Sequence, residues 1–175
     1  MEIRSESRIA HPLDAVFHAY RDHLPDAAKF IPDIREVIVR KREEFEGRVS
    51  LHNEWVGDRE LPAIAQGFLK PEHLRWDDFA TWHTEGTWCD WTIKTRAFTD
   101  RVHCKGKNQL VADGPTRTFV RLTGELRIDV IELPGIPSFI AKRIAPQLEK
   151  FIVSLITPNL EQTNRGIEAY LDSKR

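Results

Sequence analysis

The residues best suited to chemistry in this 175-residue sequence are aromatic and amide side chains that alternate with other residue types in strand-like segments. Large rigid aromatic surfaces with a few polar groups among them are what a site for an apolar molecule requires. A buried amide costs about 1–3 kcal/mol unless it is hydrogen-bonded, so each must meet a protein group, a water or a ligand. We therefore predict a ligand-lining set on strand faces and on the long C-terminal helix: Leu51, Asn53, Trp55, Trp76, Cys89, Trp91, Ile93, Asn108, Leu122, Phe151 and Leu155.

A filled core is the alternative explanation for the ligand-lining set. Each tryptophan taken singly is better explained as core packing, and Asn53 and Asn108 could be satisfied by neighbouring backbone or by water. Only the tryptophans taken together favour the walls of a cavity over a solid interior. Both interpretations stay open at the level of sequence.

Catalytic motifs are missing from the sequence. It contains no HExxH, GxSxG, Walker or GxGxxG pattern and no Cys/His cluster with metal-ligand spacing. Asp77 and Asp78 are neighbours in a predicted strand, so their side chains point to opposite faces and cannot act as a pair. His83, Glu85 and Asp90 flank a predicted turn, where solvation explains them. We predict no catalytic residues, no metal and no cofactor, and the sequence offers no strong candidate for an acid or base facing the interior.

An unusually apolar loop, residues 57–71, lies between two predicted strands. With the apolar start of the C-terminal helix and its two cations, it could form the mouth of a cavity and dip into a membrane interface. The alternatives are a loop packed back on the sheet and an oligomer contact. The predicted mouth or membrane contact comprises Leu61, Ile64, Phe68, Ile136, Phe139, Ile140, Lys142 and Arg143.

Charge and hydropathy exclude several classes of protein. Lys and Arg number 26 and Asp and Glu 27, interleaved along the chain. A nucleic-acid binder needs a concentrated basic face, so we expect no nucleic-acid partner. No apolar run approaches the roughly 20 residues that span a bilayer, and residues 1–6 show no signal-peptide core. We expect a cytoplasmic protein, with peripheral membrane contact and oligomeric state left open.

Two cysteines are present, Cys89 and Cys104. If their strands pair through the predicted turn near residues 98–101, Cys104 lies opposite Thr95 and Cys89 opposite Leu110. The two sulfurs would then be too far apart on the ladder for a disulfide. We predict two free, buried thiols.

Hydrophobic periodicity predicts one short helix, a series of strands and one long helix. The short helix opens at Pro12 and carries an apolar stripe to Leu24. The long helix should cover the dry face of the sheet, with Pro146 and Pro158 kinking or breaking it. The predicted strands are Ile3–Ile9, Ile34–Arg40, Arg48–Val56, His73–His83, Thr87–Arg96, Val102–Val111 and Thr116–Val130, and the long helix is Ser138–Leu171.

This order of elements resembles the helix-grip superfamily, which includes START domains, polyketide cyclase/dehydrase-like proteins, plant pathogenesis-related allergens and coenzyme Q-binding proteins. The segment Ala10–Phe17 is similar to the opening signature of these proteins, and Phe30–Ile34 to their return into the second strand. The glycine-rich loop of the plant allergens is absent; Glu43–Gly47 stands there instead. The resemblance implies an α+β fold, with a curved antiparallel sheet of about six to seven strands around a long C-terminal helix, in a single domain spanning residues 1–175.

Three functions compete on this basis. We favour a non-catalytic protein that binds, and carries, a hydrophobic small molecule or lipid in an internal cavity. The second is an enzyme of the polyketide cyclase/dehydrase type that uses the same cavity. The third is an interaction protein whose cavity is vestigial. An ionisable cavity lining would favour the enzyme, and a dry lining with an apolar rim the carrier.

Overall fold

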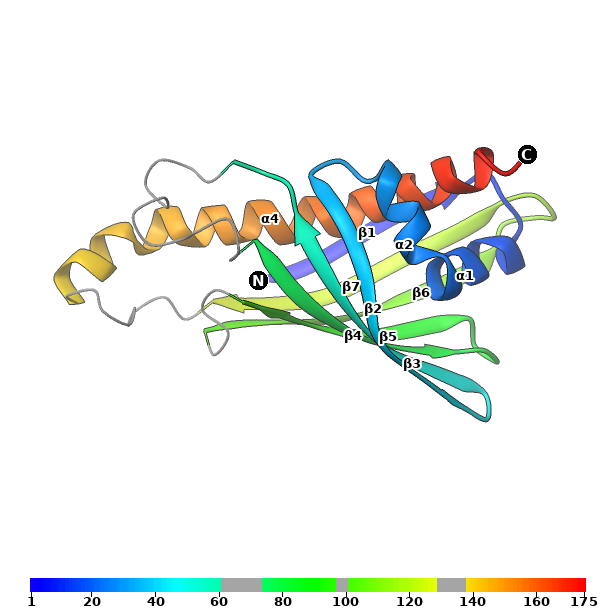
Figure 1. The fold of residues 1–175 in the computed structure, drawn as a ribbon, viewed down its shortest axis with the longest axis horizontal. Helices are drawn as coiled ribbons and strands as arrows, with labels where there is room; N and C mark the ends of the chain where they lie inside the picture. Colours follow the sequence, from blue (N-terminus) through cyan, green and yellow to red (C-terminus); the bar gives the residue numbers. More distant parts are fainter. Residues whose placement is uncertain (61–73, 97–100, 129–137) are drawn as a thin grey trace.

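The computed structural model describes residues 1–60, 74–96, 101–128 and 138–175, the last with the backbone complete and some side chains of residues 138–159 not described. Seven strands, four helical segments and their connections make up the described chain (Figure 1). In chain order they are β1 (Glu2–Ile9), α1 (Leu13–Asp22), α2 (Leu24–Ala27), the 3₁₀ turn η1 (Ala28–Phe30), β2 (Ile34–Phe45), β3 (Arg48–Gly57), β4 (Arg75–His83), β5 (Trp88–Thr95), β6 (Val102–Ala112), β7 (Thr118–Ile128) and α4 (Ser138–Asp172).

The strands form one antiparallel sheet in the order β1-β7-β6-β5-β4-β3-β2. Strands β2 to β7 follow one another as a meander, and β1 returns from the start of the chain to pair with β7. The long helix α4 runs along the sheet, while α1 and α2 lie near its C-terminal end (Figure 1). This confirms the predicted α+β architecture of a curved antiparallel sheet with a long C-terminal helix.

Turn residues determine where two of the hairpins reverse. Gly47, between β2 and β3, has φ +71°, and Gly114, between β6 and β7, has φ +83°. Glycine adopts this left-handed conformation without the steric penalty of a Cβ atom. The Glu46–Gly47 and Asp113–Gly114 pairs predict both turns, so turn chemistry sets the hairpin register at these two points.

Aromatic packing closes the interior at the end of the sheet covered by α1. The ring of Phe17 meets that of Trp82 edge to face at 5.4 Å, and Tyr20 lies 5.6 Å from the same indole. All three side chains are buried. Edge-to-face pairs add about 0.5–1.5 kcal/mol beyond the burial of their surface. This end of the molecule is therefore solid core.

Helix α4 is fastened to the sheet through its C-terminal half. The Tyr20 hydroxyl donates to Asn164 Oδ1, and Asn164 Nδ2 donates to Ser7 Oγ at 2.6 Å. Gly166 lies so close to Ile31 that an added Cβ atom would stand 2.4 Å from its side chain. The helix backbone can approach η1 this closely only because the residue is glycine.

Two predictions about local geometry need correction. Helix α4 is continuous through Pro146 and Pro158, so neither proline breaks it, while a kink at either residue stays a prediction. The predicted β5–β6 register is wrong by two residues, because Cys104 pairs with Ile93, and Cys89 with Asn108. The cysteines are nevertheless free and buried, as predicted.

Candidate functional site

The inner face of the sheet, which looks toward α4, is built in rows that cross the strands. Residues directly opposite in antiparallel strands point to the same side, so the register defines each row. One row comprises Asn53, Asp78, Ile93 and Cys104, on β3 to β6. The tryptophan pair Trp55–Trp76 lies on one side of it, with rings stacked at 5.8 Å and 15°.

Asp78 is a carboxyl group on this inner face. Asn53 Nδ2 donates to Asp78 Oδ2 at 3.2 Å. Burial raises the pKa of Asp78 to about 6, and the Asn53 amide and the Trp55 indole oppose that rise only in part. Desolvation disfavours the charged form, and no cation contacts this carboxyl among the described residues. Asp78 is therefore a group that can gain or lose a proton near neutral pH inside the protein.

Two polar atoms beside Asp78 have no hydrogen-bond partner among the described residues. They are Asn53 Oδ1 and Trp55 Nε1, on side chains that are 1 % and 7 % exposed. The Trp55 indole acts on the pKa of Asp78 as a weak hydrogen-bond donor, but its geometry falls short of a full hydrogen bond to the carboxyl. Buried polar atoms without a hydrogen-bond partner are rare in folded proteins, so each one needs a specific explanation.

Trp91 lies flat against the inner face over a pair of glycines. Gly106 and Gly124 are opposite one another on β6 and β7, and an added Cβ atom on Gly106 would stand 2.3 Å from Cζ2 of the indole. The indole Nε1 donates to Asn108 Oδ1 at 3.0 Å, which holds the ring down. The two glycines keep the sheet surface low, so the ring forms a floor instead of standing up into the interior.

Several inner-facing residues keep part of their surface uncovered although they point toward α4. Side chains that filled the interior completely would leave such positions fully buried. The exposure is partial at positions spread over four strands, in contrast to the solid packing near α1. The half-buried inner residues are Trp76, Asp78, Thr95, Gly106, Asn108, Gly124 and Ile128.

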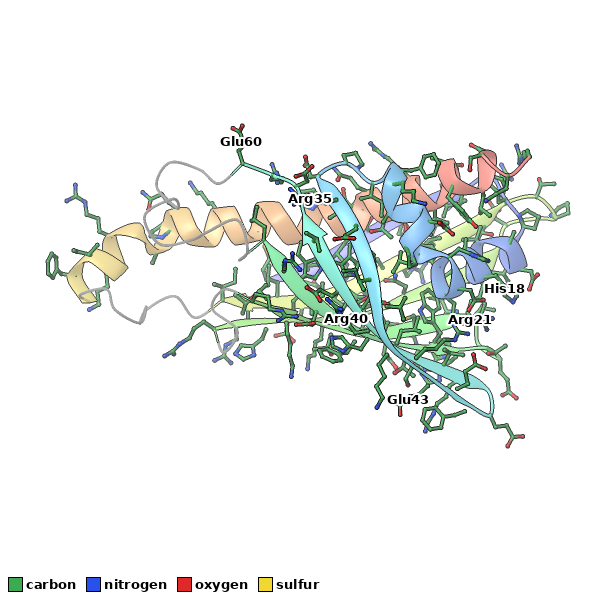
Figure 2. All side chains as sticks on the ribbon, viewed as in Figure 1. His18, Arg21, Arg35, Arg40, Glu43 and Glu60 are labelled. Atoms are coloured by element: carbon green, nitrogen blue, oxygen red, sulfur yellow. The ribbon has the colours of Figure 1, made fainter. Side chains whose placement is uncertain are left out.

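The carboxylates on the outer face have the opposite electrostatics. Glu54 has a side chain only 5 % exposed because arginines cover it: Arg40 Nη2 lies 2.5 Å and Arg75 Nη1 2.9 Å from its oxygens. Hydrogen bonds from Arg75 and Arg40 hold its pKa below the usual range. Figure 2 labels Arg40, which extends from the middle of β2. Asp77 likewise pairs outward with His52 at 2.7 Å. Arginine and histidine side chains thus pair with Glu54 and Asp77 on the outer face. The partner of Asp78 among the described residues is instead the neutral amide of Asn53.

Most of the predicted ligand-lining set does share the inner face. Leu51, Asn53, Trp55, Cys89, Trp91, Ile93 and Leu122 are buried there, and Trp76 and Asn108 are half-buried. Phe151 and Leu155 belong to α4, but their side chains lie outside the described residues. Contact of any of these residues with a ligand stays a prediction.

The predicted mouth is only partly described. Leu61, Ile64, Phe68 and Ile136 lie outside the described residues. Phe139 is 73 % exposed, Ile140 is half-buried, and Lys142 and Arg143 are exposed on the first turns of α4. In Figure 1 this end of α4 extends beyond the strands. The role of these residues as a mouth or membrane contact stays a prediction.

Asp78 and the Gly106–Gly124 pair are inner-face features that the sequence reasoning missed. The expectation that no strong acid or base candidate faces the interior was wrong, because Asp78 does so. The alternation Trp76, Asp78, Ala80, Trp82 could have revealed it, since an aspartate that shares a strand face with two tryptophans points inward. The glycine pair could not be found that way, because it depends on the β6–β7 register.

Other reactive groups in the described chain do not assemble into a site. Burial raises the pKa of the Cys89 thiol, and that of Cys104 to about 12, so both thiols stay protonated. His83 Nε2 and Asp90 lie 3.5 Å apart at the β4–β5 turn. The described residues hold no His/Cys/Asp/Glu group arranged for a metal, and none of their helices has the length and apolar composition to cross a membrane.

A groove of about 480 Å³ runs between β1 and α4, away from the row that contains Asp78. Charged side chains from both elements line it, among them Glu6, Arg8, Glu161 and Arg165. Such a lining suits water and ions better than an apolar ligand. We therefore place the candidate site on the inner face around Asn53, Asp78 and Trp91.

Comparison with known proteins gives structural matches only, since no family model and no curated protein sequence matches this chain. The protein TTHA0849 from Thermus thermophilus superposes with a TM-score of 0.67 at 19% identity, covering 99% of each chain. The Zhui aromatase/cyclase from Streptomyces sp. R1128 gives 0.62 at 15% identity, covering 98% of this chain and 95% of that one. Norcoclaurine synthase from Thalictrum flavum gives 0.58 at 15% identity, covering 98% and 92%.

Identities this low carry information about architecture and not about activity. The matches nevertheless extend over nearly the whole chain and include the antiparallel sheet and the long terminal helix. The fold implied by the Ala10–Phe17 segment is thereby confirmed. The chain has the helix-grip fold of the START/SRPBCC proteins.

Proposed function

We propose that this protein binds, and carries, a hydrophobic small molecule held between the inner face of the sheet and α4. The observation that carries the proposal is that inner-facing residues, Trp76 among them, stay partly uncovered beside the Trp91 ring that lies over Gly106 and Gly124. An aromatic floor removes the apolar surface of a ligand from water, which contributes about 25 cal/mol per Å². The Zhui aromatase/cyclase and norcoclaurine synthase, whose folds this chain shares, act on organic molecules according to their names.

Tryptophan substitutions on the two faces of the sheet test this proposal. Trp76 lies on the inner face, whereas Trp88 is on the outer face, stacked on His83 at 3.7 Å. Binding of the uncharged probe N-phenyl-1-naphthylamine is measured by its fluorescence, with stoichiometry from a titration. Trp76→Ala should weaken binding about tenfold or more, because a buried aromatic contact is worth more than about 1.4 kcal/mol.

Trp88→Ala is the matched control, because it removes the same side chain from the outer face. It should leave the dissociation constant within about twofold. Equal effects of the two substitutions, or no saturable binding to the unaltered protein, would contradict an interior site. Near-UV circular dichroism verifies that each variant is folded.

An acid–base enzyme is the second candidate, and the position of Asp78 favours it. A carboxyl group with a pKa of about 6 is suited to both taking and returning a proton near neutral pH. Exchange of the α-protons of 1-tetralone in D₂O, followed by proton NMR, detects such chemistry: the carboxylate takes a proton from carbon and a deuteron returns to the enolate. Exchange that is no faster with the unaltered protein than with Asp78→Asn would exclude this role for that ketone class.

A further inference from the structure

The two atoms beside Asp78 that have no partner among the described residues differ in hydrogen-bonding character. Asn53 Oδ1 is an acceptor and Trp55 Nε1 is a donor, and both side chains are more than nine-tenths buried. They are two residues apart on β3, so they point to the same side of the sheet. Leaving a buried donor or acceptor unpaired costs about 1–3 kcal/mol. A ligand group that paired both atoms would recover that free energy on binding.

The Asn53 amide nitrogen already has a partner in the protein. Its Nδ2 donates to Asp78, whereas its oxygen has no partner among the described residues and is the acceptor open to a ligand. Asn108 provides the contrast on the same face, because its Oδ1 accepts from Trp91 Nε1. Within the described part of the chain, one inner amide oxygen is therefore satisfied and the other is not.

The charge of the inner face further restricts the chemical classes of ligand that fit the site. Among the described inner-facing residues of β1 and β3 to β7 there is no lysine or arginine, whereas Asp78 is an acid. On β2, Arg42 lies opposite Leu51, but its guanidinium is paired with Asp22 of α1 at 2.9 Å. A carboxylate or phosphate head group beside Asn53 would therefore meet a carboxyl group instead of a cation. The described residues of the inner face thus disfavour anionic lipids and fatty acids.

A hydroxyl group is the simplest neutral group that both donates and accepts a hydrogen bond. An ether or ketone can only accept, which leaves Asn53 Oδ1 unpaired, and a hydrocarbon pairs with neither atom. The stacked indoles of Trp55 and Trp76 offer a flat apolar surface next to these atoms. Rings stack on such surfaces with a gain beyond their buried area.

We propose that the ligand is a neutral ring compound with a hydroxyl group, which donates to Asn53 Oδ1 and accepts from Trp55 Nε1 while its ring lies along Trp76. This inference rests on the proposed function, because it specifies the ligand of the same interior site. It replaces the general class of hydrophobic molecules or lipids by hydroxylated, uncharged ring compounds such as phenols and cyclic alcohols.

Four naphthalene probes test the proposal by equilibrium dialysis against the full chain. They are 2-naphthol, 2-methoxynaphthalene, naphthalene and 2-naphthoate, which share one ring system and differ only at the substituent. 2-Naphthol should bind about five- to tenfold more tightly than 2-methoxynaphthalene, the ratio expected for one recovered hydrogen bond. 2-Naphthoate should bind more weakly than 2-naphthol at pH 8, where it is an anion.

Substitutions at the two unpartnered groups locate the preference. Asn53→Ala should reduce the 2-naphthol to 2-methoxynaphthalene ratio to within about twofold of one, because only the hydroxyl can donate to Asn53 Oδ1. Trp55→Phe should instead weaken both of these probes relative to naphthalene, because a hydroxyl oxygen and an ether oxygen both accept from Trp55 Nε1. Gln109→Ala is the control, since it removes an amide from the outer face of β6, where its Nε2 donates to the Gly86 carbonyl oxygen at 2.7 Å, and it should keep the ratio. If Asn53→Ala does not fold, the ratio in the unaltered protein and the loss of affinity relative to naphthalene in Trp55→Phe still decide.

The outcomes separate this inference from the proposed function. Equal binding of 2-naphthol, 2-methoxynaphthalene and naphthalene would overturn the hydroxyl preference and leave interior binding of apolar molecules standing. Tighter binding of 2-naphthoate would overturn the selection against anions. No binding of any probe would overturn both the inference and the proposed function.

Discussion

At the scale of single residues, the environment of a carboxyl group decides what it can do. Asp77 and Asp78 are neighbours in β4, yet one pairs with a histidine on the outer face and the other is desolvated beside an amide. The strand's alternation separates them by one residue and gives them different chemistry. Burial of the Asp78 carboxyl lowers the stability of the folded protein at neutral pH. Carboxyl groups with such shifted pKa values are typical of functional positions.

Replacing Asp78 by asparagine should stabilise the protein at neutral pH. The folded-state pKa of about 6 lies above the 3.8 of a free aspartate, so the folded protein binds the proton more tightly. The stability linked to this group is fully present below about pH 4 and is lost as the pH rises through about 6. The difference corresponds to at most about 3 kcal/mol at pH 7.

Urea unfolding of the unaltered protein and of Asp78→Asn between pH 4 and 8 measures this effect. The difference in free energy of unfolding should grow across that range and level off above pH 7. Asp77→Asn serves as the control, because it removes a carboxylate of the outer face that is already paired with Arg96 and His52. A difference independent of pH would mean that the Asp78 carboxyl is not desolvated.

At the scale of elements, strands β5, β6 and β7 together build the floor of the site. Trp91 comes from β5 and the two glycines from β6 and β7, and only the observed register brings them together. A side chain at either glycine would force the indole upward. The floor is thus a property of three paired strands and not of any one of them.

Gly106→Ala should destabilise the protein by about 2 kcal/mol or more, because the new methyl group would lie 2.3 Å from Trp91 and 2.4 Å from the Thr123 carbonyl oxygen. Urea unfolding gives the free energy, and near-UV circular dichroism reports the displaced indole. Gly114→Ala is the matched control: it strains a turn at φ +83° but meets nothing within 4 Å. It should cost about 1 kcal/mol and leave the tryptophan spectrum unchanged.

If both glycine variants changed the near-UV spectrum equally, Trp91 would not depend on the glycine pair. The floor would then need another explanation.

At the scale of the whole molecule, the two ends of the chain hold the helix to the sheet. His11 Nε2 lies 2.8 Å from Asp172 Oδ1, and the Ala10 amide donates to Glu168 at 2.8 Å. These contacts join the end of β1 to the last turns of α4, more than 150 residues away in sequence. The other end of α4, by contrast, extends beyond the strands in Figure 1.

Asp172→Ala should lower the free energy of unfolding by about 1–3 kcal/mol, because it leaves the buried His11 ring without this partner. Amide hydrogen exchange should speed up in the last two turns of α4. Glu161→Ala, an exposed site on the same helix, should change the stability by less than about 0.5 kcal/mol. Unchanged exchange in Asp172→Ala would show that the helix end is held by packing alone.

The sequence by itself determined the order of elements, the fold class and most of the inner-facing residues. The reason is that strand alternation, turn glycines and the apolar stripe of a helix are local patterns that need no partner to be recognised. Val120, Leu122 and Leu126 on β7 are buried as their alternation predicts. Tertiary structure alone decided the rest. Three features depend on strand register and on what covers the sheet: the desolvation of Asp78, the lack of a partner for Asn53 Oδ1 among the described residues, and the position of Trp91 over two glycines. Register and cover are in turn set by contacts between residues far apart in the chain.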